Sequence, residues 1–269
     1  MSMVRVRGIE LAYAEAGAGM PVVLLHGYPF NRSMWREQSE RLAGAQRVLT
    51  PDLRGMGESG GAGEGGAAAT MEEMAEDLAA LLEELGVAER VVLGGLSMGG
   101  YVALAFYRLY PQRVRALVLA DTRATPDTPE ARRGREESAR KALTEGMRPI
   151  ADAMLPKLLA PATLEREPEI AARVREMILE TRPEGAASAL RGMAVRRDQT
   201  DLLPRIGVPT LLLFGTLDAL TPPAEAEALH GAIRGSRLVF IEGAGHVSNM
   251  ERPREFTRAL EEFLATLAA

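Results

Sequence analysis

The most informative absence in this sequence of 269 residues is cysteine, which does not occur at all. Without a thiol the chain can form no disulfide, no iron–sulfur cluster and no thiolate zinc site, and it has no cysteine nucleophile. Histidine is also scarce, because only His26, His230 and His246 are present. Any proton transfer through an imidazole must therefore use one of these three residues.

Long apolar runs and excess positive charge are also missing. No apolar stretch approaches the roughly 18 residues that a membrane-spanning helix needs, and the first residues do not resemble a secretory signal. The 32 Lys and Arg are outnumbered by 37 Asp and Glu, which argues against a nucleic-acid-binding surface. The 46% of hydrophobic residues is typical of a folded globular protein. We therefore expect a cytoplasmic protein that binds neither nucleic acid nor membranes.

Short strand-like runs alternate with helical patterns along most of the chain. Eight runs have strand character, namely Val4–Arg7, Ile9–Ala14, Val22–Leu25, Arg47–Thr50, Val91–Gly94, Val114–Ala120, Thr210–Phe214 and Leu238–Ile241. Several are nearly continuous Val, Leu and Ile, as in strands that are buried on both faces. One intervening helix begins with a capping-box pattern, Thr70 with Glu73, and ends before Gly86. The alternation predicts an α/β fold with a mostly parallel sheet and helices on both faces.

The segment from Thr122 to Thr200 breaks this alternation, because its composition is helical and it contains no convincing strand pattern. It stands between two predicted strands, and open parallel sheets bind ligands beyond the carboxyl ends of their strands. We therefore predict a core domain of residues 1–121 and 201–269, interrupted by a helical lid at 122–200. The glycine-rich stretch Gly60–Gly66 is expected to be a flexible surface loop.

The strongest chemical signal is the pentapeptide Gly-Leu-Ser-Met-Gly at 95–99, which stands between a predicted strand and a predicted helix. A serine between two glycines at such a turn is typical of a nucleophile elbow. The turn is so tight that larger flanking side chains would collide, and the following helix directs free N–H groups toward a developing oxyanion. We therefore predict that Ser97 is a nucleophile.

A serine nucleophile needs a base, which we expect to be a histidine. His246 lies in a loop of small residues just beyond a predicted strand, from which its ring can project toward the nucleophile. His26 follows another strand and is expected to hold a loop in place, and His230 is expected at the surface of a polar helix. His246 is thus the predicted general base.

The base must in turn be oriented by a buried carboxylate. Asp218 follows the predicted strand at 210–214, and Asp121 is a rival acid that we expect to anchor the start of the lid. The order Ser97, Asp218, His246 along the chain matches the order of the α/β-hydrolase triad. These three residues form the predicted catalytic triad.

A tetrahedral intermediate also needs two hydrogen-bond donors. One should be the backbone N–H of the residue after the nucleophile, which is Met98. The second should come from the loop after Leu25, where we predict the backbone N–H of Tyr28. Losing one such donor typically lowers a rate by about 10²–10³.

Together these motifs resemble the α/β-hydrolase superfamily in order and spacing. The resemblance is carried by the elbow, Asp218 and three short motifs, His26-Gly27-Tyr28-Pro29, Asp52-Leu53-Arg54-Gly55-Met56-Gly57-Glu58-Ser59 and Gly245-His246. It implies an eight-stranded, mostly parallel sheet with an antiparallel second strand and a helical cap at 122–200. The context of the elbow looks like that of carboxylesterases related to 3-oxoadipate enol-lactonases. For Arg54 and Glu58 the resemblance implies a structural role.

Serine at position 97 favours acyl transfer, because the epoxide hydrolases and haloalkane dehalogenases of this fold use aspartate there. Our preferred interpretation is a serine carboxylesterase that hydrolyses small to medium esters through an acyl-enzyme. The alternatives are an enol-lactonase, a perhydrolase or cofactor-free haloperoxidase, a hydrolase of carbon–carbon bonds in diketones, and a non-catalytic ligand-binding protein. The lactonase must bind a substrate carboxylate, for which the candidates are Arg123, Arg132, Arg133 and Arg135.

The expected partner is a small-molecule ester or lactone. We predict substrate contacts at Gly27, Arg123, Met154 and Leu155, although the apolar residues of the lid could equally serve to pack it onto the core. No cofactor and no metal is implied, because the acidic residues and histidines lack the spacing of metal ligands.

Overall fold

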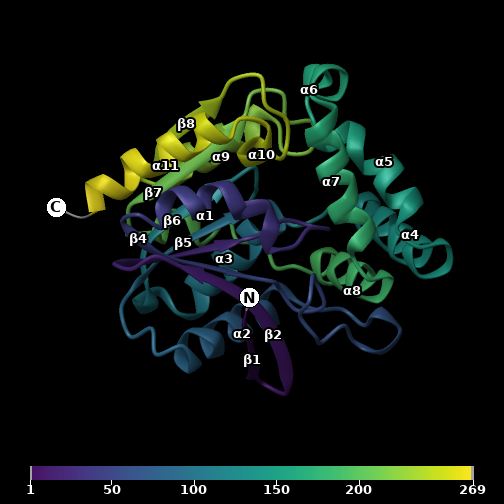
Figure 1. Ribbon diagram of the computed structural model, residues 1–269, viewed down its shortest axis with the longest axis horizontal. Coiled ribbons are helices and arrows are strands. Elements are labelled where there is room, and N and C mark those ends of the chain that lie inside the picture. The colour runs from purple at the N-terminus through teal and green to yellow at the C-terminus, as the bar shows by residue number, and fades with distance from the viewer. Residues whose placement is uncertain (1, 268–269) are drawn as a thin grey trace.

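The computed structural model describes residues 2–267, and its centre is an eight-stranded sheet (Figure 1). All eight strands lie where the sequence predicts them. Their bounds are β1 Ser2–Val6, β2 Ile9–Ala16, β3 Met20–Leu25, β4 Gln46–Pro51, β5 Val91–Leu96, β6 Val114–Ala120, β7 Thr210–Gly215 and β8 Arg237–Ile241. Across the sheet their order is β1-β2-β4-β3-β5-β6-β7-β8.

The directions of the strands match the expected fold. β2 runs antiparallel to both of its neighbours, β1 and β4, and all other neighbouring strands are parallel. β5 and β7 are buried along their whole lengths, which explains their continuous apolar sequences. The mostly parallel α/β sheet with an antiparallel second strand is therefore confirmed.

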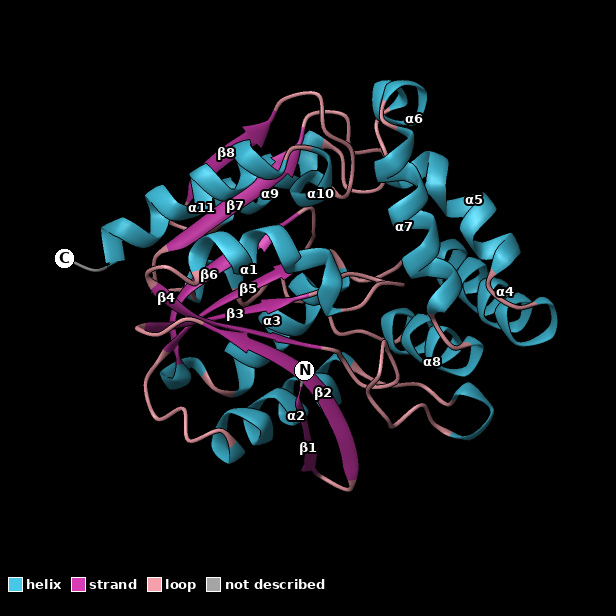
Figure 2. Ribbon diagram, viewed as in Figure 1, coloured by secondary structure: helices cyan, strands magenta, loops and turns pink. Residues whose placement is uncertain are grey.

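Helices cover both faces of this sheet (Figure 2). α1 (Arg36–Leu42) and α11 (Pro253–Leu267) contact each other on one face. α2 (Met71–Glu84) and α3 (Met98–Leu109) contact each other on the opposite face, and α9 (Pro223–Ala232) packs against β7 and β8. The central strands therefore lose contact with water on both sides.

α2 begins at the predicted capping box. The backbone N–H of Glu73 donates to Thr70 Oγ1 at 3.1 Å, and the backbone N–H of Thr70 donates to the Glu73 carboxylate at 2.8 Å. The two bonds satisfy donors that the start of a helix leaves without partners. The buried residues of α2 repeat at helical spacing and face the sheet.

Residues 122–200, which we call the insertion, contain five helices and no strand, and the structure describes all of them. The helices are α4 Pro129–Glu145, α5 Arg148–Leu158, α6 Pro161–Arg166, α7 Pro168–Glu180 and α8 Pro183–Ala194. Each has a proline in its first or second position, where the missing N–H removes no helical hydrogen bond. Figure 2 shows the arrowheads of the parallel strands pointing toward the insertion, which therefore lies over the carboxyl edge of the sheet.

The glycine-rich stretch at 60–66 was expected to be a flexible surface loop, and α8 bonds to its end. The Arg191 guanidinium donates to the carbonyl oxygens of Gly65 and Gly66, at 2.8 Å in both cases. The Ser188 hydroxyl donates to the Ala67 carbonyl oxygen at 2.6 Å. The loop thus fastens the insertion to the core.

Among residues 2–267, no helix combines the length and apolar character that crossing a membrane requires.

Candidate active site

Ser97 stands at the turn between β5 and α3 with a φ of 55° and a ψ of −114°. A positive φ is uncommon outside glycine and marks a strained position. The flanking glycines make room for it: a Cβ atom on Gly95 would lie 2.2 Å from the Gly99 carbonyl oxygen. A Cβ atom on Gly99 would lie 2.2 Å from the Leu25 carbonyl oxygen. The small residues of the elbow therefore have a direct steric cause.

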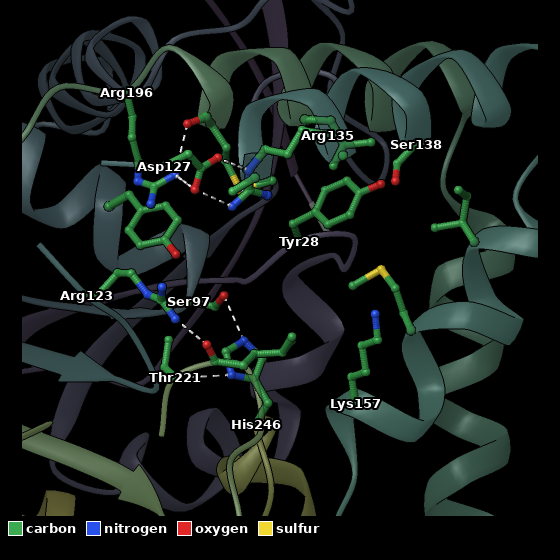
Figure 3. A pocket seen from close by; sticks show the side chains of 18 of the residues that line it. Tyr28, Ser97, Arg123, Asp127, Arg135, Ser138, Lys157, Arg196, Thr221 and His246 are labelled. Carbon is green, nitrogen blue, oxygen red and sulfur yellow. Dashed lines mark hydrogen bonds and ion pairs between the residues drawn. The ribbon is translucent and has the colours of Figure 1, made fainter. Parts of the chain in front are cut away.

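The three side chains of the predicted triad form a hydrogen-bonded series with His246 at its centre. Ser97 Oγ is 2.8 Å from His246 Nε2 (Figure 3). His246 Nδ1 is 2.8 Å from Asp218 Oδ2. The imidazole and the carboxylate are buried, with residue exposures of 2% and 3%. When Nδ1 carries the proton that faces Asp218, Nε2 is free to accept a proton from the serine hydroxyl.

A turn that the sequence analysis did not identify holds the Asp218 carboxylate. The backbone N–H groups of Leu220 and Thr221 donate to Oδ1 at 2.8 and 2.9 Å, and the Thr221 hydroxyl donates to Oδ2. Burial alone would raise the pKa of Asp218, but the neighbouring His246 and these hydrogen bonds outweigh it and lower that pKa. The local pattern Asp-x-x-Thr is a signal that could have revealed this turn.

The rival acid Asp121 binds other partners. Its Oδ1 accepts a hydrogen bond from the backbone N–H of Gly215 at 2.8 Å, and its Oδ2 accepts one from the Ser248 hydroxyl. Burial, together with the charge of Asp218, raises the pKa of Asp121 well above its usual range. Gly215 begins the loop that leads to Asp218, and Ser248 follows His246 closely, so Asp121 ties these two loops together.

The other two histidines lie where the sequence analysis expected them. His26 is fully buried, with Nδ1 2.9 Å from the Gly27 carbonyl oxygen, and its Nε2 accepts a hydrogen bond from the Leu53 N–H at 2.9 Å. Burial lowers the pKa of His26, which favours the neutral ring. His230 is exposed on α9, and its Nδ1 lies 2.9 Å from Ser236 Oγ.

The motif at 52–59 forms hydrogen bonds and ion pairs that link it to other segments. Arg54 donates two hydrogen bonds to the Asp77 carboxylate, at 2.6 and 2.7 Å. Glu58 forms an ion pair with Arg32, which also pairs with Asp52. These contacts agree with the structural role that the resemblance implies.

The loop that carries Tyr28 runs directly against the predicted nucleophile. A Cβ atom on the preceding residue, Gly27, would lie 3.4 Å from Ser97 Cβ. Met98 is the first residue of α3, where a helix leaves its N–H groups free. Within residues 2–267, neither the Tyr28 N–H nor the Met98 N–H has a hydrogen-bond acceptor. Both predicted oxyanion donors are therefore free to bind a ligand atom.

Ser97 and His246 open into a cavity of about 490 Å³ that the insertion covers (Figure 3). Its apolar lining includes Ile150, Met154, Leu190, Met193 and Leu220. Its charged lining consists of Arg123, Asp127, Arg135, Lys157 and Arg196.

Among the described residues, no group of three or more His, Asp and Glu side chains is placed to hold a metal ion.

Two of the four predicted substrate-contact residues line the cavity, and two do not. Arg123 and Met154 line it, whereas Gly27 and Leu155 lie outside its lining. A Cβ atom on Gly27 would meet Leu96, and Leu155 is partly buried against the hydrophobic core. Among the candidate arginines for a lactone carboxylate, Arg123 and Arg135 line the cavity. Arg132 and Arg133 are exposed and do not line it, because they project from a different side of α4.

The insertion bonds directly to the loop that carries His246, which the sequence analysis did not foresee. The backbone N–H of His246 donates to the Leu158 carbonyl oxygen at 2.9 Å. The buried Glu251 carboxylate accepts hydrogen bonds from the Gly245 N–H at 2.7 Å and from the Ala160 N–H at 2.8 Å. Burial raises the pKa of Glu251. The position of the imidazole therefore depends on the insertion.

Known proteins resemble this chain along nearly its whole length. The family described as "alpha/beta hydrolase fold" matches residues 20–253. A solved thermophilic esterase from Thermogutta terrifontis, with malate bound, is 46% identical, covers 100% of both chains and has a TM-score of 0.96. An enol-lactonase from Burkholderia xenovorans is 35% identical over 98% of this chain and 100% of its own, with a TM-score of 0.90.

A curated relative of this chain is also an enol-lactonase. It is 3-oxoadipate enol-lactonase 2 from Acinetobacter baylyi, 29% identical over 255 residues, which cover 94% of this chain and 92% of that protein. The family match spans far more than half of the chain, and it agrees with the strand order. The chain therefore belongs to the alpha/beta hydrolase family.

Proposed function

We propose that this protein is a serine carboxylesterase that hydrolyses small to medium carboxylic esters through an acyl-enzyme. One observation carries the proposal: the hydrogen-bonded series Ser97, His246 and Asp218 opens into a ligand-sized cavity. The similarity to an esterase and to enol-lactonases supports hydrolysis of an ester-type bond. The insertion then acts as the cap of a core domain formed by residues 1–121 and 201–269.

In the proposed reaction, Ser97 Oγ attacks the ester carbonyl carbon while its proton passes to His246 Nε2. The backbone N–H groups of Tyr28 and Met98 stabilise the negative oxygen that forms. His246 then protonates the departing alcohol oxygen as the carbon–oxygen bond breaks. A water molecule, deprotonated by His246, then attacks the acyl carbon. The bond from that carbon to Ser97 Oγ breaks, the acid leaves, and His246 returns the proton to Oγ. Asp218, whose pKa is lowered, stays ionised and stabilises the imidazolium.

A lactonase is the second candidate, because cations line the cavity. An enol-lactone of a dicarboxylic acid keeps one free carboxylate, which Arg123 or Arg135 could bind. Both guanidiniums already have partners: Arg135 pairs with Asp127, and Arg123 donates to the Leu220 carbonyl oxygen. An esterase and a lactonase share every step above and differ in whether the alcohol stays attached to the acid.

The test is a panel of p-nitrophenyl esters from acetate to decanoate, assayed with the wild type and with Ser97→Ala. We expect hydrolysis of the shorter esters and a loss of about 10³-fold or more in kcat/KM for the variant. A fluorophosphonate should label the wild type but not the variant. Equally slow hydrolysis by both proteins would exclude Ser97 as the nucleophile. A strong preference for an enol-lactone over all the esters would favour the lactonase.

A further inference from the structure

The hydroxyl of Tyr28 is a hydrogen-bond donor that the protein does not use. The side chain lines the cavity and is only 7% exposed, and its hydroxyl has no partner among residues 2–267. Burial raises the pKa of Tyr28 despite the opposing charge of Arg135, so the hydroxyl keeps its proton at neutral pH. Buried polar groups are normally hydrogen-bonded, and an unpaired one that faces a cavity indicates a polar ligand atom.

Two further donors line the same cavity. Figure 3 shows the Ser138 hydroxyl, from α4, pointing toward the region of the Tyr28 hydroxyl. It also shows the amine of Lys157, from α5, pointing into the cavity from its opposite wall. Neither side chain forms a hydrogen bond or an ion pair with the residues that the structure describes. Lys157 is exposed, so its amine is accessible to a ligand.

The charged side chains that line the cavity favour a negatively charged ligand. Its lining holds one carboxylate, that of Asp127, against the four cations Arg123, Arg135, Lys157 and Arg196. Asp127 pairs with both Arg135 and Arg196, and Arg123 lies 3.5 Å from Glu225. Lys157 has no such acidic neighbour among the described residues. The site therefore favours an anion near Lys157.

We propose that Tyr28, Ser138 and Lys157 form a subsite for a free carboxylate at the end of the substrate remote from the reacting carbonyl group. The preferred substrates are then half-esters of dicarboxylic acids, or lactones that carry a carboxylate. Such a substrate would place its carbonyl group at Ser97 and its carbon chain along the apolar lining near Met154. This proposal rests on the proposed function, because it requires Ser97 to attack an ester bond.

The test compares monoethyl adipate, which carries one carboxylate, with neutral diethyl adipate. A second pair is a γ-lactone with a carboxymethyl side chain and its methyl ester. For the pair that is hydrolysed faster, we expect the kcat/KM of the wild type to be about tenfold or more higher for the substrate with the free carboxylate than for its neutral partner. A difference of this size is that of a charge-assisted hydrogen bond. Lys157→Met should bring this selectivity ratio close to one, and Tyr28→Phe should lower it. Lys141→Met removes the other lysine of the chain, which is exposed on α4 outside the cavity lining, and should leave the ratio unchanged.

Salt gives an independent measurement of the same contact. Raising NaCl from about 0.05 to about 0.5 M should lower the ratio for the wild type but not for Lys157→Met, because exposed charges are screened. A ratio that Lys157→Met leaves unchanged would overturn the subsite, while Ser97-dependent hydrolysis of the neutral ester would still support the proposed function. If no ester or lactone is hydrolysed with dependence on Ser97, the proposed function itself is wrong.

Discussion

The backbone carbonyl of Leu158 accepts a hydrogen bond from the backbone N–H of His246, at 2.9 Å. Leu158 is the last residue of α5 in the insertion, and His246 is the predicted general base on the core. Close beside this bond, Glu251 links Gly245 to Ala160. The element that covers the cavity and the loop that positions the imidazole are therefore one hydrogen-bonded unit.

Glu251→Gln tests this unit. A glutamine side chain has a single acceptor oxygen, so its amide N–H groups would face one of the two backbone N–H donors. We expect the free energy of unfolding to fall by about 1–3 kcal/mol. We also expect kcat/KM to fall by about tenfold or more, because the imidazole would be misplaced. Denaturant unfolding and ester hydrolysis measure the two effects. Glu242→Gln, at an exposed position nearby, is the matched control and should change neither value.

Asp121→Asn should change how stability depends on pH. The pKa of Asp121 is raised in the folded protein, so the unfolded chain loses this proton first as the pH rises above about 4. The group therefore makes the wild type less stable, relative to the variant, as the pH rises toward 7. Asparagine does not titrate and can keep the bonds to Gly215 and Ser248.

Urea unfolding at three pH values between about 4 and 7 measures this trend. Asp121→Ala is the comparison, because it loses both hydrogen bonds and should be destabilised by about 1–3 kcal/mol. A stability difference between the wild type and Asp121→Asn that stays constant across these pH values would contradict the prediction.

The Asp218 carboxylate should not limit activity at any pH near neutrality. Because the pKa of Asp218 is lowered, its carboxylate stays charged at every pH above its ordinary range near about 4. This carboxylate should therefore cause no loss of kcat/KM between about pH 8 and pH 5. Asp218→Asn should lower kcat by roughly 10⁴-fold, because the ring would lose its orientation. An Asp218→Asn variant that keeps the kcat of the wild type would argue against Asp218 as the residue that orients His246.

Gly99→Ala should damage the elbow through a steric clash alone. The added methyl group would lie 2.2 Å from the Leu25 carbonyl oxygen, on backbone that cannot swing away. We expect a loss of about 3 kcal/mol in the free energy of unfolding, together with most of the activity. Gly231→Ala is the control, because nothing lies within 4 Å of its added methyl group, near the end of α9. It should be neutral or stabilising by up to about 1 kcal/mol. Equal stability of the two variants would refute the steric explanation.

The parts of the molecule that sequence could predict are those with local causes. Buried parallel strands have continuous apolar sequences, and the elbow needs its small residues for a steric reason found within the turn itself. The contact of Glu251 with Ala160 joins residues far apart in the sequence, in segments that no pattern relates to each other. Which residues line the cavity also depends on how the helices are oriented in the folded protein. Arg132, Arg133 and Arg135 stand close together on α4, yet only Arg135 reaches the cavity, because the helix turns the others away.

The bonds between Leu158, Ala160 and the loop at 245–251 also bear on how new specificities could be engineered in this family. A recombinant chain that takes its insertion from one parent and this loop from another would bring together partners that were never matched. Crossover points are therefore best placed so that residues 158–160 and 245–251 come from the same parent. An exchange of the other helices that line the cavity would then leave the hydrogen bonds around His246 matched.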